Sequence, residues 1–253
     1  NKKFLRSWYE MSIKNLGLKY LDFKETNLKD QYWVPYNKGG DSRKWYGNQE
    51  FVVNFHKSGR DFTRGKHQFS EFFFKPCFSW TYLSISSLDT RYFPEGFIWD
   101  VSGSSAFPND NEDIYYFVPL IASKVGYLLL NIINPTINFQ VENLCLLPII
   151  YPDKVIKDRI IFITSENISI SKNDWDIRET SWDFEQSSLL NESSSLKEAY
   201  QKWQDNATQD FFQLHKNEEE LNRIFIDIYG LQEELTPEVA LKDITILQEE
   251  LNG

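Results

Sequence analysis

The sequence predicts an α+β fold in which a β-rich domain with one apolar helix is followed by a mainly α-helical region with one long helix. Three observations predict this fold. Short segments with alternating apolar residues recur between residues 51 and 118, and turns containing Gly or Pro separate them. An apolar helical pattern follows at 120–134, and a far longer one fills 195–229. The 253 residues suffice for one large domain or for two smaller ones, each with its own core.

The first half is predicted to contain an N-terminal helix and several strands. The strand segments are rich in β-branched and aromatic residues and cover 51–55, 80–85, 97–101 and 115–118. Residues 1–30 are expected to form a helix and a connector. A further short strand is expected at 137–141, beyond the apolar helix. Short strands separated by long irregular loops favour a curled, partly open β-structure.

The chain changes character after Pro152, where we place a domain boundary. The expected units are a connector at 1–30, a β-rich domain at 31–151 and a helical C-terminal domain at 152–253. The last unit should begin with a helix at 154–163, followed by a polar, tryptophan-rich connector at 174–183.

The long helix carries its own start and stop signals. Ser195 and Glu198 form a capping box, in which each side chain satisfies a free amide at the helix start, and Gly230 stands where a C-terminal cap is needed. An unbroken helix here would be about 50 Å long at 1.5 Å per residue. Glu218 is the one polar interruption of its apolar stripe, and residues 218–220 are expected to form a solvated face. Thr236 and Pro237 are expected to start a short helix.

Charge is divided unevenly along the chain. Residues 1–100 hold 16 Lys and Arg against 11 Asp and Glu, a net charge of +5, whereas residues 101–253 hold 11 against 26, a net charge of −15. A basic half that could meet DNA is therefore joined to an acidic half that would repel it. Ordinary variation of charge along a chain is the alternative explanation.

Signatures of catalysis and of metal binding are missing from the sequence. Cys77 and Cys145 are too few and too far apart for a metal site, and the three histidines add no ligand cluster. Both cysteines are expected to be buried thiols in a reducing compartment such as the bacterial cytoplasm. The sequence contains no phosphate-binding glycine loop and no zinc-protease motif. We therefore predict no catalytic, cofactor-binding or metal-binding residue in this chain.

The most informative segment is 36–48, which packs three cations, three glycines, three aromatic rings and two asparagines into one turn-rich stretch. Cations bind phosphate, asparagine amides can pair with an adenine edge, and glycines let a backbone approach a ligand closely. These properties favour a DNA-reading loop over a catalytic centre. A surface turn of an ordinary protein could carry the same residues.

Each type of candidate residue has a distinct expected role at DNA. Asn48 and Gln49 are candidates for adenine edges. Trp45 and Tyr46 either stack on DNA sugars or anchor the loop, and we favour the anchor because adjacent aromatic residues at a glycine turn usually pack. Residues 43–67 hold six cations against two acids and are expected to face the duplex. Phosphate contacts, with one or two guanine contacts among them, are expected from Lys38, Arg43, Lys44, Arg60, Arg64, Lys66 and Arg91.

Two resemblances to known families support a role of this chain in DNA recognition. Residues 133–148 (INPTINFQVENLCLLP) resemble the end of target-recognition domains in type I specificity subunits and type II restriction-methylation proteins, which pass through a Leu-Pro exit into a long helical spacer. Three further segments resemble the PglX family, the adenine-specific DNA methyltransferases of BREX phage-defence systems. They are 34–48 (VPYNKGGDSRKWYGN), 174–184 (DWDIRETSWDF) and 217–230 (NEEELNRIFIDIYG).

The PglX resemblance covers about Tyr32 to Val239 and implies a division of labour. An upstream methyltransferase domain would bind S-adenosylmethionine and flip an adenine out of the duplex for N6 methylation. This chain contains no Asn/Asp-Pro-Pro-Tyr/Phe motif of that domain and begins without Met, so we expect a piece of a longer polypeptide. The resemblance assigns DNA site selection to 31–151 and a helical brace to the remainder, with double-stranded DNA, the upstream domain and other BREX proteins as partners.

Two rival functions remain open at this point. The acidic helical half could dock other defence proteins, so that the chain is an interaction scaffold without DNA contact. An independent nuclease is the weaker rival, because the sequence shows no constellation of carboxylates that would hold a metal.

Overall fold

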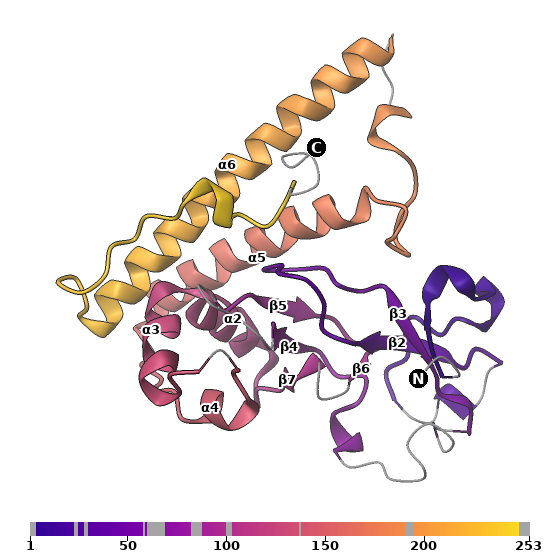
Figure 1. Cartoon of the computed structure of the whole chain (residues 1–253), viewed down its shortest axis with the longest axis horizontal. Helices are drawn as coiled ribbons and strands as arrows, with labels where there is room; N and C mark the ends of the chain where they lie inside the picture. The colour runs from indigo at the N-terminus through magenta and orange to yellow at the C-terminus, as the bar shows by residue number, and fades with distance from the viewer. Residues whose placement is uncertain are drawn as a thin grey trace.

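A computed structural model shows an α+β molecule in which two long helices lie side by side over a β-rich part (Figure 1). The structure describes residues 4–22, 25–27, 30–57, 59, 69–81, 88–99, 103–136, 138–190 and 195–247. The fold class predicted from the sequence is confirmed.

The first sheet has four strands in the order β1-β3-β2-β6, with bounds Leu5–Ser7, Phe51–Asn54, Trp33–Asn37 and Ile98–Trp99. Strand β3 pairs antiparallel with β1 and β2, and β6 runs parallel to β2. One face buries Val34, Val53 and Phe55 together with Phe74 from the loop before the second sheet. The apolar residues that alternate along 51–55 thus face the core as predicted, since Val53 and Phe55 are buried there.

The second sheet has three antiparallel strands in the order β5-β4-β7, with bounds Thr90–Phe93, Cys77–Trp80 and Ser105–Ala106. Strand β4 is buried along its whole length. Strand β4 ends at Trp80, which is the first residue of the strand predicted at 80–85. Most of that predicted strand cannot be compared, because residues 82–87 fall outside the described residues. Between β3 and β4 the described chain includes one short 3-10 turn, η4 (Ser70–Phe72).

The prediction of a helix within residues 1–30 is wrong for the part of this segment that the structure describes. Strand β1 comes first, and the 3-10 turns η1 (Trp8–Glu10), η2 (Ile13–Asn15) and η3 (Glu25–Asn27) follow it. Backbone pairing of β1 with β3 satisfies the amides that a helix would have used.

A bent helix pair replaces the strand predicted at 115–118 and the single helix predicted at 120–134. After η6 (Asn111–Asp113), helix α2 (Ile114–Ala122) and helix α3 (Lys124–Ile133) meet at an angle of 75°. The Ser123 hydroxyl caps α3 by accepting from the Gly126 amide. Tertiary packing of the buried Tyr116 and Val118 overrides the strand preference of their local sequence. The strand expected at 137–141 is also wrong, because helix α4 (Val141–Cys145) begins there.

Helices α5 (Lys154–Asp176) and α6 (Leu196–Tyr229) form the upper layer of the molecule (Figure 1). Helix α5 starts where predicted but runs on through Asp174 and Trp175, which we had expected in a connector. Helix α6 confirms its predicted limits, since the Ser195 hydroxyl accepts from the Glu198 amide and Gly230 has φ 66°. Between the two helices lies η7 (Ser188–Leu190).

The C-terminal segment runs back along α6 (Figure 1). Residues 235–240 are not helical, so the helix expected at Thr236 is wrong, and η8 (Leu241–Asp243) follows. Ile244 and Ile246 are buried in the core.

One hydrophobic core joins both sides of the expected boundary at Pro152. It includes Trp80 and Tyr116 from the β-rich part and Ile160, Leu214 and Phe225 from the long helices. Division of the chain into two separate domains stays a prediction, and the helices are braced directly on the β-rich part.

The two cysteines differ in exposure, which corrects the expectation that both are buried. Cys77 is buried, and burial raises the pKa of its thiol to about 12, whereas Cys145 is exposed. We expect iodoacetamide at neutral pH to alkylate Cys145 rapidly and Cys77 only after denaturation, because the thiolate is the reactive form. Mass spectrometry of digested protein checks this, and rapid native labelling of Cys77 would contradict the β4 packing.

Among the described helices, none is individually both long and apolar enough to cross a membrane. The bent pair at 111–122 and 124–133 has the length and composition for it when the two are taken together.

Candidate functional site

The loop at 38–49, which we call the central loop, is wedged between the second sheet and the two long helices. Trp45 extends the sheet locally, since its amide donates to the Thr90 carbonyl at 2.9 Å and its carbonyl accepts from the Tyr92 amide at 2.9 Å. Gly47 has φ 128°, and a Cβ atom there would lie 2.3 Å from Arg43 Nε. The glycine-rich sequence therefore permits a tight turn in which Arg43 packs against the loop itself.

Arg43 is held inside the molecule by helix α5. Its Nη2 donates to Asp174 Oδ2 at 2.7 Å and to the Ser171 carbonyl at 3.1 Å, and its Nε donates to the Tyr46 carbonyl at 2.7 Å. The guanidinium also lies 5.1 Å from the centre of the Trp175 ring. A planar guanidinium suits this fork of acceptors and the aromatic face together.

Lys44 and Trp45 share one carboxylate on helix α6. Lys44 Nζ lies 2.7 Å from Glu218 Oε2, and Trp45 Nε1 donates to Glu218 Oε1 at 2.8 Å. Burial is the largest single cause and acts to lower the pKa of Lys44, but the charge and hydrogen bond of Glu218, together with the charges of Asp89 and Asp243, leave this pKa raised. Lys44 is therefore charged at neutral pH inside the core. Glu218 is only 5% exposed, so its expected place on a solvated face is wrong.

The C-terminal segment closes over the same loop. The Thr245 hydroxyl accepts from the Lys44 amide at 2.9 Å, and Asp174 Oδ1 accepts from the Leu247 amide at 3.2 Å. Four parts of the chain thus meet around two buried ion pairs. The three segments that carry the PglX resemblance supply the central loop, Asp174 and Glu218.

Both aromatic rings of the central loop are buried, Trp45 to 2% and Tyr46 to 4% exposure. This placement agrees with the anchoring role that we favoured over stacking on DNA. Burial is the main cause that raises the pKa of the Tyr46 hydroxyl to about 12, although Lys172, 5.2 Å above its ring, opposes the shift. Tyr46 is neutral at physiological pH.

The remaining candidates in and beside the loop are also largely enclosed. Gln49 is buried, Lys38 and Asn48 are half-buried, and Asn48 donates to the Asp41 carbonyl at 2.9 Å. Arg91 is 1% exposed, and burial lowers the pKa of its guanidinium to about 10, so it stays charged at neutral pH. Its Nη2 donates to Thr81 Oγ1 at 2.6 Å.

The structure therefore offers little of the central loop to DNA. Arg43, Lys44 and Arg91 are buried, and their charged groups are held by partners within the chain. Their contact with DNA stays a prediction that would require the loop to move. Arg60, Arg64 and Lys66 lie outside the described residues. The described flanks of that segment expose Lys57 and Lys75, and the ring contact of Phe55 with Phe74 at 5.7 Å joins these flanks in space.

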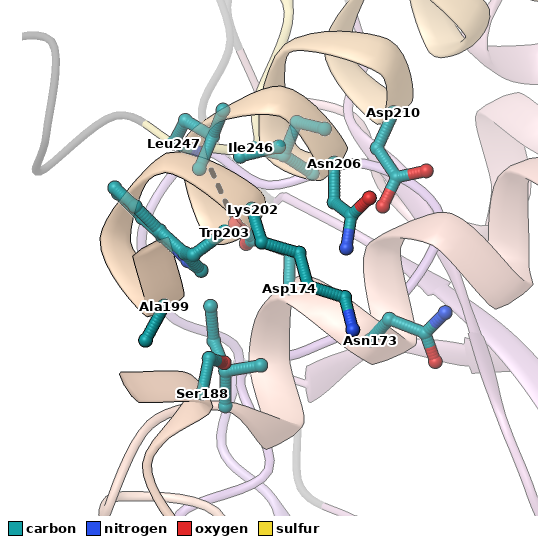
Figure 2. A pocket seen from close by; sticks show the side chains of 12 residues that line it. Asn173, Asp174, Ser188, Ala199, Lys202, Trp203, Asn206, Asp210, Ile246 and Leu247 are labelled. Atoms are coloured by element: carbon teal, nitrogen blue, oxygen red, sulfur yellow. Dashed lines mark hydrogen bonds between the residues drawn. The ribbon is translucent and has the colours of Figure 1, made fainter. Parts of the chain in front are cut away.

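Two hollows adjoin the ion pairs. The smaller, of about 170 Å³, lies between the end of α5, the first half of α6 and residues 246–247 (Figure 2). Figure 2 shows Lys202, Asn206, Asp210 and Asn173 converging on one side of it. Burial, with Asp174 as a second cause, raises the pKa of Asp210. The larger hollow, of about 660 Å³, lies on the other side, and Lys44 and Glu218 line it.

Within the residues that the structure describes, no group of three His, Cys, Asp or Glu side chains is placed to hold a metal ion. The expectation of no metal site was made from the sequence and stays a prediction for the whole chain.

Comparison with known proteins gives a consistent relationship. No protein-family model matches the chain. An adenine-specific methyltransferase PglX from Lacticaseibacillus casei (strain Zhang) is 34% identical over 97% of the chain. Nearly the whole chain is thus similar to one segment of a PglX protein. An adenine-specific methyltransferase BrxX from Escherichia coli O9:H4 (strain HS) is 30% identical over 92% of the chain. The chain spans only 21% of the PglX relative and 19% of the BrxX relative, so it corresponds to one segment of each.

Sequence reasoning missed the acidic partners of the site. Asp174 was assigned to a connector and Glu218 to a solvated face. A signal for Glu218 was present, because a single carboxylate inside an otherwise apolar helical stripe needs a buried counter-ion. Lys44, buried in a loop next to two aromatic rings, is the cation that provides it.

Proposed function

We propose that this chain selects the DNA target of a PglX-like adenine-N6 methyltransferase in a BREX phage-defence system, and that the catalytic domain lies outside the chain. The similarity of nearly the whole chain to one segment of two adenine-specific methyltransferases carries this proposal. S-adenosylmethionine would bind the remainder of the parent protein, because the motif that holds a target amine is absent from this sequence.

The segment that follows β3 is the part of the chain that the charges favour for contact with DNA. Residues 57–75 hold five cations, namely Lys57, Arg60, Arg64, Lys66 and Lys75, against the acids Asp61 and Glu71, a net charge of +3. The described ends of this segment belong to the β-rich part, which lies below the two long helices in Figure 1, and the acidic half that contains these helices would repel a duplex. The central loop then has a structural task, to fix the recognition part on the helical brace.

An electrophoretic shift assay with mixed-sequence duplex DNA at low salt tests the proposal. If about four cations neutralise phosphates, log K should fall against log[salt] with a slope of roughly −3.6. Alanine at Lys57, Arg60, Arg64 and Lys66 together should remove most of that slope, whereas alanine at the exposed Lys197 and Lys216 of α6 should leave it unchanged. The same protein should transfer no methyl group from S-adenosylmethionine. Unchanged affinity in the fourfold variant would refute this surface.

The alternative function, a protein-interaction scaffold, is favoured by one observation, the net charge of −15 on residues 101–253. A chain that shifts no DNA at low salt, alone or within its parent protein, would leave the scaffold as the better description.

A further inference from the structure

The larger hollow is a groove between α3, α6 and the C-terminal segment, which we call the α3–α6 groove. Its volume of about 660 Å³ falls within the range of roughly 300–1,000 Å³ that is typical of ligand sites. Half-buried apolar side chains form the walls, with Tyr127 and Leu128 on α3 facing Leu235 and Val239. Unlike the smaller hollow of Figure 2, it is bounded by residues well inside the described ranges.

The apolar surface continues beyond the mouth of the groove. Ile132 follows Leu128 by one helical turn and is 71% exposed, and Leu241 follows the lining residue Ala240 and is 50% exposed. Ile132 thus extends the apolar wall on α3, and Leu241 adds an exposed apolar side chain next to the lining of the C-terminal segment. A groove with apolar walls, one of them on a helix with apolar positions one turn apart, is the kind of surface that accepts the apolar face of an amphipathic helix.

The charges around the groove determine which charged side chains such a segment should carry on its polar face. Lys44 and Glu218 on the floor neutralise one another, and the rim carries Glu238, Asp243 and Lys124. The lining therefore has a net charge of −1 within a half of the chain whose net charge is −15. This field attracts a basic segment and repels an acidic one.

We propose that the α3–α6 groove docks an amphipathic segment of a partner protein, with apolar side chains in the groove and Lys or Arg side chains facing Glu238 and Asp243. The residues that line the groove are not part of the basic segment 57–75, so this interaction is separate from DNA binding. It also adjoins the Lys44–Glu218 pair, so a docked segment would rest directly on the contact that fixes the central loop to α6.

Fluorescence anisotropy with a labelled leucine–lysine amphipathic peptide tests the groove. We expect the full chain to bind this peptide and to bind the matching leucine–glutamate peptide at least tenfold more weakly. Ala122→Trp, which fills the groove without changing charge, should weaken binding at least tenfold. Glu238→Gln with Asp243→Asn should weaken it roughly two- to fivefold, as for exposed ion pairs.

Matched changes elsewhere separate docking from general attraction to an acidic protein. Ser169→Trp on the exposed face of α5, and Glu142→Gln with Glu233→Gln, should leave binding unchanged. Circular dichroism establishes folding of each variant, and Leu128→Ser replaces Ala122→Trp if the latter does not fold. Unchanged peptide binding in the groove variants, or equal binding of both peptides, would overturn the proposal. The DNA shift should be the same in all of these variants, and its loss in a groove variant would contradict the separation of docking from DNA binding.

Discussion

Glu218→Ala should lower the free energy of unfolding by about 3–5 kcal/mol, because it leaves a buried lysine without its counter-ion. Lys44 and Glu218 have side chains that are 6% and 5% exposed, so the lysine stays largely shielded from water when the carboxylate is removed. Trp45 Nε1 would lose its acceptor as well. Urea-induced unfolding monitored by tryptophan fluorescence measures the change. For a chain of this size the melting temperature should fall by roughly 6–20 °C.

Two further variants identify the cause of that loss. Replacing both partners, Lys44→Met with Glu218→Leu, should recover most of the stability, since it removes the isolated charge along with the ion pair. Lys154→Ala breaks the exposed pair with Asp158 and should have no measurable effect. If Glu218→Ala were as stable as the Lys154→Ala control, the buried pair would not exist in solution.

Arg43→Ala should cost about 3 kcal/mol, at the lower end of the range for a broken buried ion pair. Asp174 keeps a second cation, because Arg178 Nη2 lies 3.6 Å from its Oδ1. Arg43→Lys should recover less than half of the loss, since an ammonium group on a flexible stem cannot reach the Tyr46 carbonyl, the Ser171 carbonyl and Asp174 in the same arrangement. Thermal and urea unfolding of the two variants provide the comparison.

The same variants decide whether Arg43 also touches DNA. Measured well below the unfolding transition, Arg43→Ala should leave the salt slope of DNA binding unchanged, whereas Lys57→Ala should flatten it by about 0.9. A flatter slope for Arg43→Ala at full folding would instead mean that the central loop opens on DNA and presents its cations to phosphates.

The parts of the fold predicted correctly are those that local chemistry determines. Helix α6 begins at a serine cap and ends at a glycine with φ 66°, and both signals are contained in a few neighbouring residues. The alternation at 51–55 identified β3 in the same way. By contrast, Tyr115 to Val118 have aromatic and β-branched side chains that suit a strand, and only their packing against α5 and β5 makes them helical.

For a related reason, the sequence could not show where the cations of the central loop are held in the folded chain. The composition of the central loop correctly identified a stretch with specific partners, and the cations were assigned to DNA phosphates. The partners are Asp174 and Glu218, which lie 131 and 174 residues further along the chain. No pattern within the loop distinguishes a phosphate from a distant carboxylate, because both are anionic oxygen acceptors for the same donors.

The closing of the C-terminal segment over the central loop also bears on how the chain is made. Thr245, the acceptor of the Lys44 amide, is synthesised 201 residues after it. At translation rates of about 5–20 residues per second, the central loop would wait roughly 10–40 s for this last contact. Until Asp174 and Glu218 have been synthesised, the loop would hold its two cationic groups against water or a passing polyanion. The finished arrangement is thus reached only after Thr245 has been synthesised.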